Sequence, residues 1–577
     1  MNKRSIYRHQ SAISEDIAQS NLHPVLKRIY SNRGVSNLNQ VDYSLEHLLP
    51  LDQLKGLDDA VSILKDAVIQ NKKILIVGDF DADGATSTAV CYRALTMLGL
   101  NNIAYLVPNR FDFGYGLTPE LVEVAKDYHA DVLITVDNGI SSLQGVASAK
   151  QYGMQVVVTD HHLAGKQLPN ADAIVNPNQP GCDFPSKHLA GVGVIFYVML
   201  ALRQVMRNDH LFNELRPEPN MAVLLDLVAL GTVADVVPLD ENNRILVRQG
   251  LKRITAGKCC VGIQAILKVA GRDIDNIVAT DLGFSVGPRL NAAGRLEDMS
   301  LGIECLLTDD MSRAMQIAAE LDELNRNRRV IEQDMQQQAM ITLEPILSNL
   351  GNEQLPKGLC LYDQSWHQGV IGILASRIKE KFNRPVIAFA SNGDGEIKGS
   401  ARSIKGLHIR DALEAIATRY PGLIIKFGGH AMAAGLSLAE SNFEKFQQAF
   451  VEEADKHLDD KALRGVIDSD GELCAADMNL QLAECLRMAG PWGQHFPEPV
   501  FDGEFEVDNW RVVGDNHLKM QLRSADSDDV IDAIAFNTSV EQLTSIEGFI
   551  RAAYRLDVNS FRNRKTAQLI VEYFESI

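Results

Sequence analysis

The chain has 577 residues, which is too long for one hydrophobic core, so we expect about three domains. Hydrophobic residues make up 46% and charged residues 23%, ordinary values for a folded protein that exclude disorder as the default for long stretches. The net charge of -19 argues against a polyanionic partner, because non-specific nucleic-acid binding relies on clustered Lys and Arg.

The charge is not evenly distributed along the chain. Residues 351–440 carry eleven Lys and Arg against eight Asp and Glu, so a local phosphate-binding face remains compatible with the acidic total. The first residues lack the apolar core of a signal peptide, and the apolar run from Leu189 to Leu202 is shorter than the roughly 20 residues of a membrane span. Eight scattered cysteines without a CxxC pair fit a reducing compartment, so we expect a cytoplasmic protein with no membrane contact.

The chain begins with an N-terminal extension, residues 1–50, and continues with a first α/β domain, residues 51–308. In this domain short apolar runs alternate with longer helical stretches, which is typical of a parallel sheet covered on both faces. Three runs, Ile74–Val77, Val132–Val136 and Val156–Val158, are closely followed by acidic residues. Ligands of open α/β sheets bind beyond the carboxyl ends of the strands, so these acids fall where chemistry is expected.

A connecting helix is predicted over residues 309–350, where apolar residues recur at helical spacing. A second, smaller α/β domain follows over residues 351–462, with LCLYD and VIAFA as strands. In residues 463–577 Leu518, Met520 and Leu522 alternate with polar residues, and further short strands are separated by turn residues. This pattern predicts a small C-terminal β-barrel.

The motif GDFDADG, residues 78–84, is the strongest chemical signal. Asp79, Asp81 and Asp83 stand at alternate positions between a strand and a helix, so their charges converge unless a cation neutralises them. Taken alone, such a loop is equally well explained as a solvated turn that caps a helix.

Two further strand ends carry the same kind of residue. ITVDNG places Asp137 after the second strand, and VVVTDHH places Asp160, His161 and His162 after the third. A lone His pair is more often a surface or core feature than a ligand, but three acid-bearing strand ends at one sheet edge favour a metal site.

A fourth segment, LLDLVALGTVADVVPL, supplies Asp226 and Asp235, although alone it reads as a buried helix followed by a turn. Carboxylates and imidazole without thiolates suit Mn²⁺ or Mg²⁺ better than structural zinc. Enzymes that hydrolyse phosphate esters commonly have a pair of such metal sites, so phosphoryl transfer is the expected reaction class.

These segments together resemble the DHH phosphoesterase superfamily and, within it, the RecJ family of single-stranded-DNA exonucleases. The resemblance extends from about residue 35 to the end of the chain, with the motifs in the family's order. The matching pieces are GDFDADG, VDNG, TDHH, DLVALGTVADVVPL, GPRLNAAGR, SWHQGVIGI, SARS and FGGHAMAAG.

The resemblance implies two divalent metal ions, Mn²⁺ or Mg²⁺, and a set of ligands for them. These ligands would be Asp81, Asp83, Asp137, His161 and Asp226, with Asp137 bridging the two ions. Asp79 matches the acid that begins the motif in RecJ-like chains, and would bind the first ion either directly or through its neighbours.

The remaining polar residues of these motifs receive supporting roles. His162 is expected to contact a phosphate or to orient a ligand, and Asp160 lies beside it in the motif. Asp235 is expected to be structural, through the turn before Pro238.

We expect contacts to the phosphates of the substrate from two motifs. GPRLNAAGR would place Arg289, Asn291 and Arg295 on a Gly-flanked loop, where guanidinium groups take phosphate oxygens; the alternative is a solvent-exposed loop. In the second domain, which resembles the DHH-associated domain, the contacts to backbone phosphates would come from His367, Arg402, Gly428, Gly429 and His430. A Gly pair followed by His is weak evidence alone, since paired glycines often mark only a tight turn.

The C-terminal barrel resembles the oligonucleotide-binding (OB) barrel of the RecJ family. Such barrels hold single strands by stacking bases on aromatic rings beside basic residues. The candidates are Trp510, Tyr554 and Phe561, with Arg562, Arg564 and Lys565 nearby. Packing in the barrel core is the alternative for each aromatic residue.

The resemblance implies a metal-dependent exonuclease that degrades single-stranded DNA in the 5′ to 3′ direction to mononucleotides, in DNA repair and recombination. It also implies a helicase and a single-strand-binding protein as partners. We expect the protein itself to be a monomer. Two alternatives stay open: a small-substrate phosphodiesterase or pyrophosphatase with the same metal centre, and a non-catalytic scaffold that binds single-stranded DNA.

Overall fold

The computed structural model describes residues 4–109, 116–350, 355–393, 395–514, 517–536, 538, 548–561 and 564–577. The chain divides into two compact units. The larger unit comprises residues 9–325 and 469–577, and the smaller unit comprises residues 326–468 together with the N-terminal residues up to Arg8.

The larger unit contains a five-stranded parallel sheet in the order β3-β2-β4-β5-β6. Its three central strands coincide with the three predicted apolar runs, and they are buried almost throughout because helices cover both faces. The predicted parallel α/β fold is therefore confirmed. The strands are β2 (Ile74–Gly78), β3 (Ile103–Leu106), β4 (Val132–Val136), β5 (Gln155–Thr159) and β6 (Ala173–Val175).

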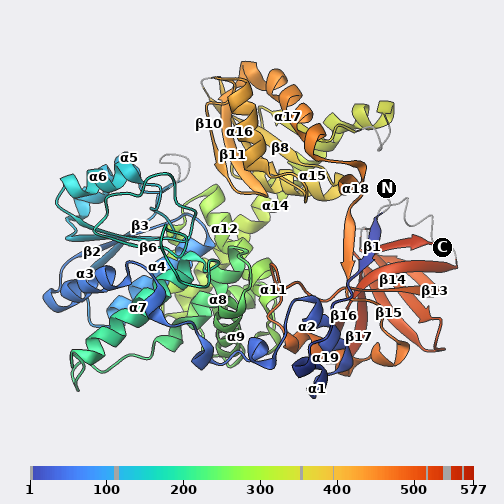
Figure 1. The fold of residues 1–577 in the computed structure, drawn as a ribbon, viewed down its shortest axis with the longest axis horizontal. Coiled ribbons are helices and arrows are strands. Elements are labelled where there is room, and N and C mark those ends of the chain that lie inside the picture. Colours follow the sequence, from blue (N-terminus) through green and yellow to red (C-terminus); the bar gives the residue numbers. More distant parts are fainter. Residues whose placement is uncertain are drawn as a thin grey trace. The chain divides into compact units, whose positions relative to one another are not determined.

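Helices lie on both faces of the parallel sheet, as Figure 1 shows, and alternate residues of β2 belong to different cores. Ile74 and Ile76 belong to the core shared with α3 (Leu57–Gln70), α4 (Ala82–Met97) and α7 (Gly191–Asn208). Leu75 and Val77 belong to a separate core beneath the helices on the other face, α5 (Pro119–Ala125) and α6 (Leu143–Gln151).

A helical layer follows the sheet and contributes to the larger core. The motif GPRLNAAGR, predicted as a loop, instead forms α12, so that prediction is wrong. Pro288 stands in its first turn, where the missing N–H of proline is tolerated. The elements of this layer are α8 (Leu225–Ala234), α9 (Glu241–Thr255), α10 (Val261–Val269), α11 (Ala279–Asp281), the π-helix η7 (Leu282–Val286), α12 (Gly287–Leu296) and α13 (Ser300–Leu307).

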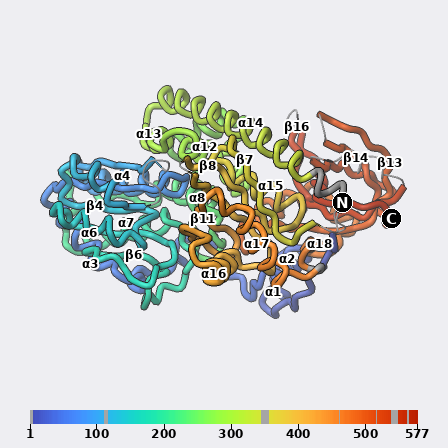
Figure 2. Tube along the Cα trace, turned by 90° about the horizontal axis from the view of Figure 1, so that it is seen from above, coloured from blue at the N-terminus to red at the C-terminus, as the bar shows by residue number. Residues whose placement is uncertain are grey.

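The predicted connector is one continuous 40-residue helix, α14 (Met311–Leu350), seen along its length in Figure 2. The smaller unit is built on a mixed sheet in the order β10-β11-β9-β8-β7. Its strands are β7 (Leu359–Asp363), β8 (Val386–Gly393), β9 (Glu396–Arg402), β10 (Lys426–Gly429) and β11 (Ala433–Ala439), and its helices are α15 (Ile371–Phe382), α16 (Ile409–Arg419), α17 (Phe443–His457) and α18 (Asp460–Arg464).

The C-terminal segment is a closed five-stranded barrel, as predicted, in the order β13-β14-β15-β17-β16. A parallel pairing of β15 with β17 closes it, and the other pairs are antiparallel. The strands are β13 (Phe501–Val513), β14 (His517–Ser524), β15 (Val530–Ala535), β16 (Phe549–Phe561) and β17 (Arg564–Ser576), and α19 (Leu480–Ala489) packs beside β16.

The N-terminal residues are joined to segments near the far end of the sequence. Arg33, which follows α2 (Pro24–Asn32), makes a paired ion contact to Asp470 at 2.7 and 2.9 Å. Tyr30 packs against Trp492 and Phe496. Strand β1 (Ser5–Arg8) pairs with β12 (Val466–Ser469), and α1 (Glu15–Gln19) precedes α2. These residues are thus part of the two units rather than an appendage.

No helix among the described residues is both long enough and apolar enough to cross a lipid bilayer.

Candidate metal centre

The aspartates of GDFDADG leave the carboxyl end of β2 and enter α4. Asp81 is the N-cap of α4 and accepts a 3.0 Å hydrogen bond from the Gly84 N–H, so the loop is held by the helix that follows it. Any side chain at Gly84 would collide with the main-chain oxygen of Asp79. The motif therefore needs glycine at that point, because the backbone folds back on itself there.

Asp137 follows β4 in the left-handed backbone region, with φ of 63°. This conformation is uncommon for a residue with a side chain, and it persists where the surroundings fix the backbone. Asn138 does this by donating its side-chain amide to the main-chain oxygens of Val77 (3.0 Å) and Val136 (2.9 Å). The carboxylate of Asp137 is buried and points to the edge where β2, β4 and β5 end.

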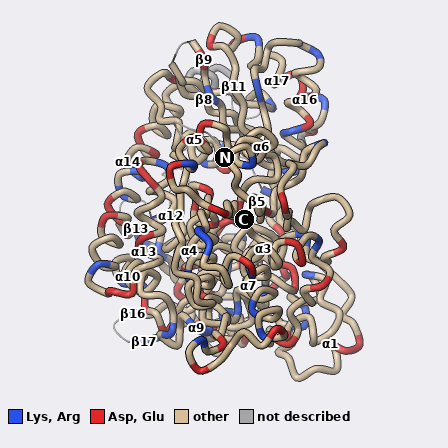
Figure 3. The backbone as a smooth tube through the Cα atoms, turned by 90° about the vertical axis from the view of Figure 1, so that its left-hand side faces the viewer, with Lys and Arg blue, Asp and Glu red and all other residues tan. Residues whose placement is uncertain are grey.

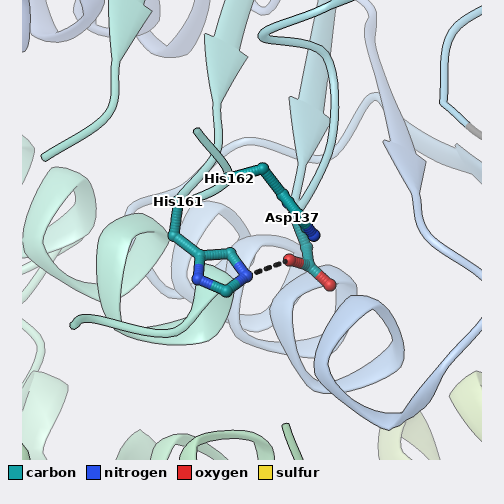
Figure 4. A group of neighbouring side chains, drawn as sticks. All are labelled: Asp137, His161 and His162. Carbon is teal, nitrogen blue, oxygen red and sulfur yellow. Dashed lines mark ion pairs between the residues drawn. The ribbon is translucent and has the colours of Figure 1, made fainter. Parts of the chain in front are cut away.

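His161 follows β5 and turns its ring toward Asp137, as Figure 4 shows. Its Nε2 atom lies 3.2 Å from Asp137 Oδ1 and 3.4 Å from Asp235 Oδ2, with Asp83 Oδ2 at 4.0 Å. Although three carboxylates surround this buried nitrogen, it makes no hydrogen bond to the described residues.

The described residues supply three overlapping sets of candidate ligands, each with its ligand atoms within 4.8 Å of one another. Asp137 and His161 each occur in two of them, so the sets form one centre. They are Asp79 with Asp81 and Asp137, Asp83 with His161 and Asp235, and Asp137 with His161 and His162.

The electrostatics of this centre fit a cation. Burial raises the pKa of Asp83, Asp137 and Asp235, and neighbouring carboxylates raise each of them further. Burial lowers the pKa of His161, which favours the neutral imidazole that binds metals. Buried carboxylates without a compensating charge are unfavourable, and divalent ions among oxygen ligands would remove that repulsion.

Asp160 and His162 form a separate pair next to the centre. Asp160 is buried and accepts hydrogen bonds from the backbone N–H groups of Ile140, His161 and His162, while His162 Nδ1 lies 2.7 Å from its carboxylate. Burial by itself would lower the pKa of His162, but the hydrogen bond and charge of Asp160 outweigh it and raise the value to about 9. The hydrogen bond to Asp160 thus favours the protonated form of His162.

Asp226 and Asp235 lie at opposite ends of α8, and of the two only Asp235 belongs to a candidate ligand set. Asp226 lies in the first turn of α8, and its Oδ2 accepts a 2.5 Å hydrogen bond from the Cys260 N–H; it belongs to none of the three candidate ligand sets. Asp235 caps the other end of α8 and reaches His161. Because α8 has ten residues, its two ends are about 15 Å apart, and only the later aspartate points into the centre.

Three family models match the chain: the DHH family N-terminal domain over residues 73–232, the DHHA1 domain over residues 355–456 and the RecJ OB domain over residues 469–573. The single-stranded-DNA-specific exonuclease RecJ of Salmonella typhimurium is 55% identical over 96% of both chains, and that of Escherichia coli is 54% identical over the same shares. The chain belongs to the RecJ family.

A solved member of the family has the same fold. The crystal structure of RecJ from Thermus thermophilus in complex with Mn²⁺ matches with a TM-score of 0.81 and 29% identity, covering 100% of this chain and 80% of that one. The expected RecJ resemblance is thus confirmed along the chain.

In the RecJ motif GPRLNAAGR, two predicted phosphate contacts are engaged within the protein. Asn291 accepts a 2.8 Å hydrogen bond from the Ala82 N–H and so positions the aspartate loop. Arg289 is buried and donates to Asp322 in α14 and to the main-chain oxygen of Ser285, while Arg295 is half-buried near the end of α12. Sequence reasoning missed the support of the loop, because nothing in the sequence shows that α12 contacts it.

In the DHHA1 domain, Arg402 is the most distinctive of the predicted residues. It lies at the end of β9 and donates to Ser400 Oγ (3.2 Å) and the main-chain oxygen of Ala401 (2.8 Å), both neutral acceptors. Burial lowers its pKa, and no carboxylate contributes to that shift. A guanidinium desolvated in this way suits an incoming anion.

The other predicted contacts of the DHHA1 domain lie on two loops. His430 is exposed in the β10–β11 hairpin, and Gly429 before it has φ of 149°, where a side chain would clash with Ala433 and Ala434. A side chain at Gly428 would meet open space. His367 follows β7 and accepts a 3.1 Å hydrogen bond from the Gly369 N–H.

The aromatic candidates of the RecJ OB domain differ in their exposure. Trp510 on β13 is 39% exposed, which leaves its ring available to a ligand. Tyr554 is fully buried against Phe501 and Phe505 in the barrel core, so the stacking role considered for it is wrong. The side chain of Phe561, like residue Arg562, lies outside the described residues, and Arg564 and Lys565 are exposed.

Proposed function

We propose that this protein is a metal-dependent exonuclease that degrades single-stranded DNA from the 5′ end to mononucleotides. The single observation that carries the proposal is the buried group of carboxylates around His161 at the carboxyl edge of the parallel sheet. Its support is the family: the RecJ relatives are named single-stranded-DNA-specific exonucleases, and Thermus thermophilus RecJ has been solved with Mn²⁺ and with Mg²⁺.

Two divalent ions would be held by the overlapping ligand sets, with Asp137 between them. Asp79 and Asp81 fit one ion, and Asp83, His161 and Asp235 fit the other. When bound, such ions supply Lewis-acid chemistry: they activate water and stabilise charge on a phosphoryl group. The proximity of Asp79 to Asp81 and Asp137 supports a role for Asp79 as a direct ligand in this proposal.

The chain itself contributes positioning and charge. The Asp160–His162 pair keeps His162 protonated beside the centre, where the imidazolium can hold a phosphate oxygen. Asn291 fixes the aspartate loop, and Arg402 offers a desolvated guanidinium for a backbone phosphate. His367, His430 and the glycines before it would make further phosphate contacts, and Arg295 would join them from α12.

The acidic net charge is compatible with a nucleic-acid substrate. Figure 3 shows acidic and basic positions interleaved over the parts of the chain that it colours. A strand held by a few phosphate contacts and by stacked bases does not need a basic molecule as a whole. Affinity should therefore fall with added salt less steeply than for a strongly basic protein.

The decisive experiment measures nucleotide release from a 5′-labelled single-stranded oligonucleotide with and without Mn²⁺. The proposal predicts that the first product is the labelled mononucleotide, that a blunt duplex is resistant, and that Asp137→Ala loses at least 99% of the activity. Release that starts from the 3′ end, or that survives removal of all divalent ions, would contradict it.

A small-substrate phosphodiesterase with the same centre is the alternative. Trp510→Ala tests it, because loss of a base-stacking ring should raise KM for a long strand about tenfold and leave a dinucleotide unaffected. Deletion of the barrel would be a poor test, since its residues share one core with the sheet domain. A non-catalytic scaffold would bind strands equally well but release nothing from any substrate.

The same family relationship supports a proposal for the cellular location, pathway and partners of the protein. The protein would act in the cytoplasm as a monomer in repair and recombination, with a helicase that supplies unwound strands and a single-strand-binding protein as partners. The domain division proposed is a DHH domain at 51–308, the connector at 309–350, the DHHA1 domain at 351–462 and the OB domain at 463–577, with residues 1–50 as a segment packed onto them.

A further inference from the structure

An exposed aromatic ring stands next to the helix that carries Asp235. Phe284 is 73% exposed. This is unusual, because full burial of a phenylalanine side chain stabilises a folded protein by up to about 3 kcal/mol, and most phenylalanines are buried. It lies in the five-residue π-helix η7, and single π-turns inserted between α-helices often occur at functional sites. The ring is therefore held outward by an unusual local structure.

The π-helix packs directly against the last turn of α8. A Cβ atom at Gly283 would lie 3.3 Å from Val233 Cγ1, and one at Gly287 would lie 3.2 Å from Ala234 Cβ. Asp235 follows these two contact residues and places its carboxylate 3.4 Å from His161 Nε2. Gly283, the neighbour of Phe284, therefore contacts the last turn of α8, and Asp235 lies at the end of that same helix.

Two arginines fix the turn that presents the ring. Arg272 donates from Nε to Ser285 Oγ at 2.9 Å, and Arg289 donates to the main-chain oxygen of Ser285 at 2.6 Å. Arg289 is itself held by Asp322 at 2.8 Å. The residue beside Phe284 is therefore anchored through both its side chain and its backbone, which makes a rigid platform rather than a loose loop.

A second apolar side chain is exposed next to the same ligand. Val236 is 64% exposed and has φ of 61°, which is strained for a β-branched residue. Val236 directly follows Asp235, so an exposed apolar side chain adjoins the candidate ligand, and η7 packs against the helix that ends there. An apolar surface beside a charged centre matches a nucleotide, which has a charged phosphate and a flat apolar base.

We propose that Phe284 is a substrate-binding residue that stacks on a nucleobase of the single strand close to the scissile phosphate. The inference rests on the proposed function, since it takes single-stranded DNA as the ligand. Stacking on an aromatic face accepts every base, so this contact would position the strand without sequence preference.

The test compares the full-length wild type with Phe284→Ala and Phe284→Trp on two oligonucleotides in Mn²⁺. One oligonucleotide has normal bases, and the other has abasic residues at its first several positions. With normal bases, Phe284→Ala should raise KM about tenfold with kcat changed less than threefold, and Phe284→Trp should restore KM to within about threefold of the wild type. On the abasic strand, the wild type and Phe284→Ala should have the same KM.

Leu215→Ala is the matched control, because Leu215 is a 98% exposed apolar residue beyond the far end of α7. That helix starts at Gly191 beside Asp137 and its 18 residues span about 27 Å, so this variant should have wild-type KM on both strands. Unchanged thermal melting of Phe284→Ala would show that the exposed ring is not needed for folding.

An unchanged KM for Phe284→Ala on normal bases would overturn the inference. An equal loss on both strands would also overturn it, because the ring would then contact the backbone, another protein or another part of this chain. These results differ from failure of the proposed function, in which the wild type itself would release no nucleotide.

Discussion

The position that a Cβ atom of Gly191 would occupy lies 2.5 Å from Cβ of Asp137, so the start of α7 touches the loop that carries this aspartate. The Gly191 N–H also donates a 2.6 Å hydrogen bond to Asp83. We predict that Gly191→Ala displaces both carboxylates and lowers kcat/KM at least 100-fold, as ångström-scale misplacement of catalytic groups does. Gly193→Ala is the control, since its Cβ would meet mainly the flexible end of Leu189; comparable losses in both variants would contradict the prediction.

Asp235 and Asp226 are predicted to differ sharply on substitution. Asp235→Asn should abolish Mn²⁺-dependent nucleotide release, because Asp235 shares a ligand set with Asp83 and His161. Asp226→Asn should keep activity within about tenfold, because an amide oxygen can still accept the hydrogen bond of the Cys260 N–H. Initial rates across a Mn²⁺ titration measure both effects, and the opposite order of losses would restore Asp226 as the ligand.

Removing one carboxylate should make the metal-free protein more stable against unfolding. It should also reduce the further stabilisation that bound metal gives. Asp137→Asn relieves repulsion among buried acids, so we expect a higher Tm than for the wild type in EDTA. Added Mn²⁺ at about 100 times Kd should stabilise the wild type by about 2.7 kcal/mol and the variant much less. Denaturant unfolding with and without Mn²⁺ checks this, and equal stabilisation of both proteins would count against the proposed centre.

Glu453 in the smaller unit gives a prediction on acid stability. It is buried and accepts hydrogen bonds from Arg419 and Lys456 at 2.8 Å, with His457 Nε2 at 3.2 Å. Burial alone would raise its pKa, but these partners outweigh burial and lower it to about 2. Because the folded value is below the unfolded one, the stabilisation is complete above about pH 4.5 and is lost as the pH falls toward 2.

Glu453→Gln should therefore lower the free energy of unfolding by on the order of 2–3 kcal/mol at pH 7 and by almost nothing at pH 2. Trp366 is the one tryptophan of the smaller unit, so its fluorescence in a background with Trp492→Phe and Trp510→Phe reports this unit. The exposed neighbour in Glu452→Gln serves as the control. A difference that persists unchanged to pH 2 would show that Glu453 is not ionised in the way described.

Much of the centre could be predicted from the sequence because parallel strands end at a common edge. Asp81, Asp83, Asp137 and His161 directly follow apolar runs, so a local pattern was enough to bring them together. The position of Asp235 beside His161 could not be predicted, because both aspartates of α8 stand in apolar surroundings in the sequence. Which end of that helix faces the sheet edge depends on packing between α8, α4 and α7 that no short motif encodes.

The other differences have the same origin in contacts between distant segments. The glycines of GPRLNAAGR indicated a loop, yet Gly294 is needed because a side chain there would collide with the main-chain oxygen of Phe80 where α12 meets the aspartate loop. Tyr554 was a candidate either for base stacking or for packing in the core, and the closed barrel places it in the core. Periodicity predicted the elements, whereas closure and helix packing decided which side chains remain exposed.

The ion pair between Arg33 and Asp470 joins residues separated by 437 positions. A ribosome that adds 5–20 residues per second would make the second partner roughly 20–90 s after the first. During translation the ring of Tyr30, which is buried in the finished protein, stays without these partners until Trp492 and Phe496 have been synthesised. We therefore expect a chaperone to bind the nascent N-terminal segment until synthesis is almost complete.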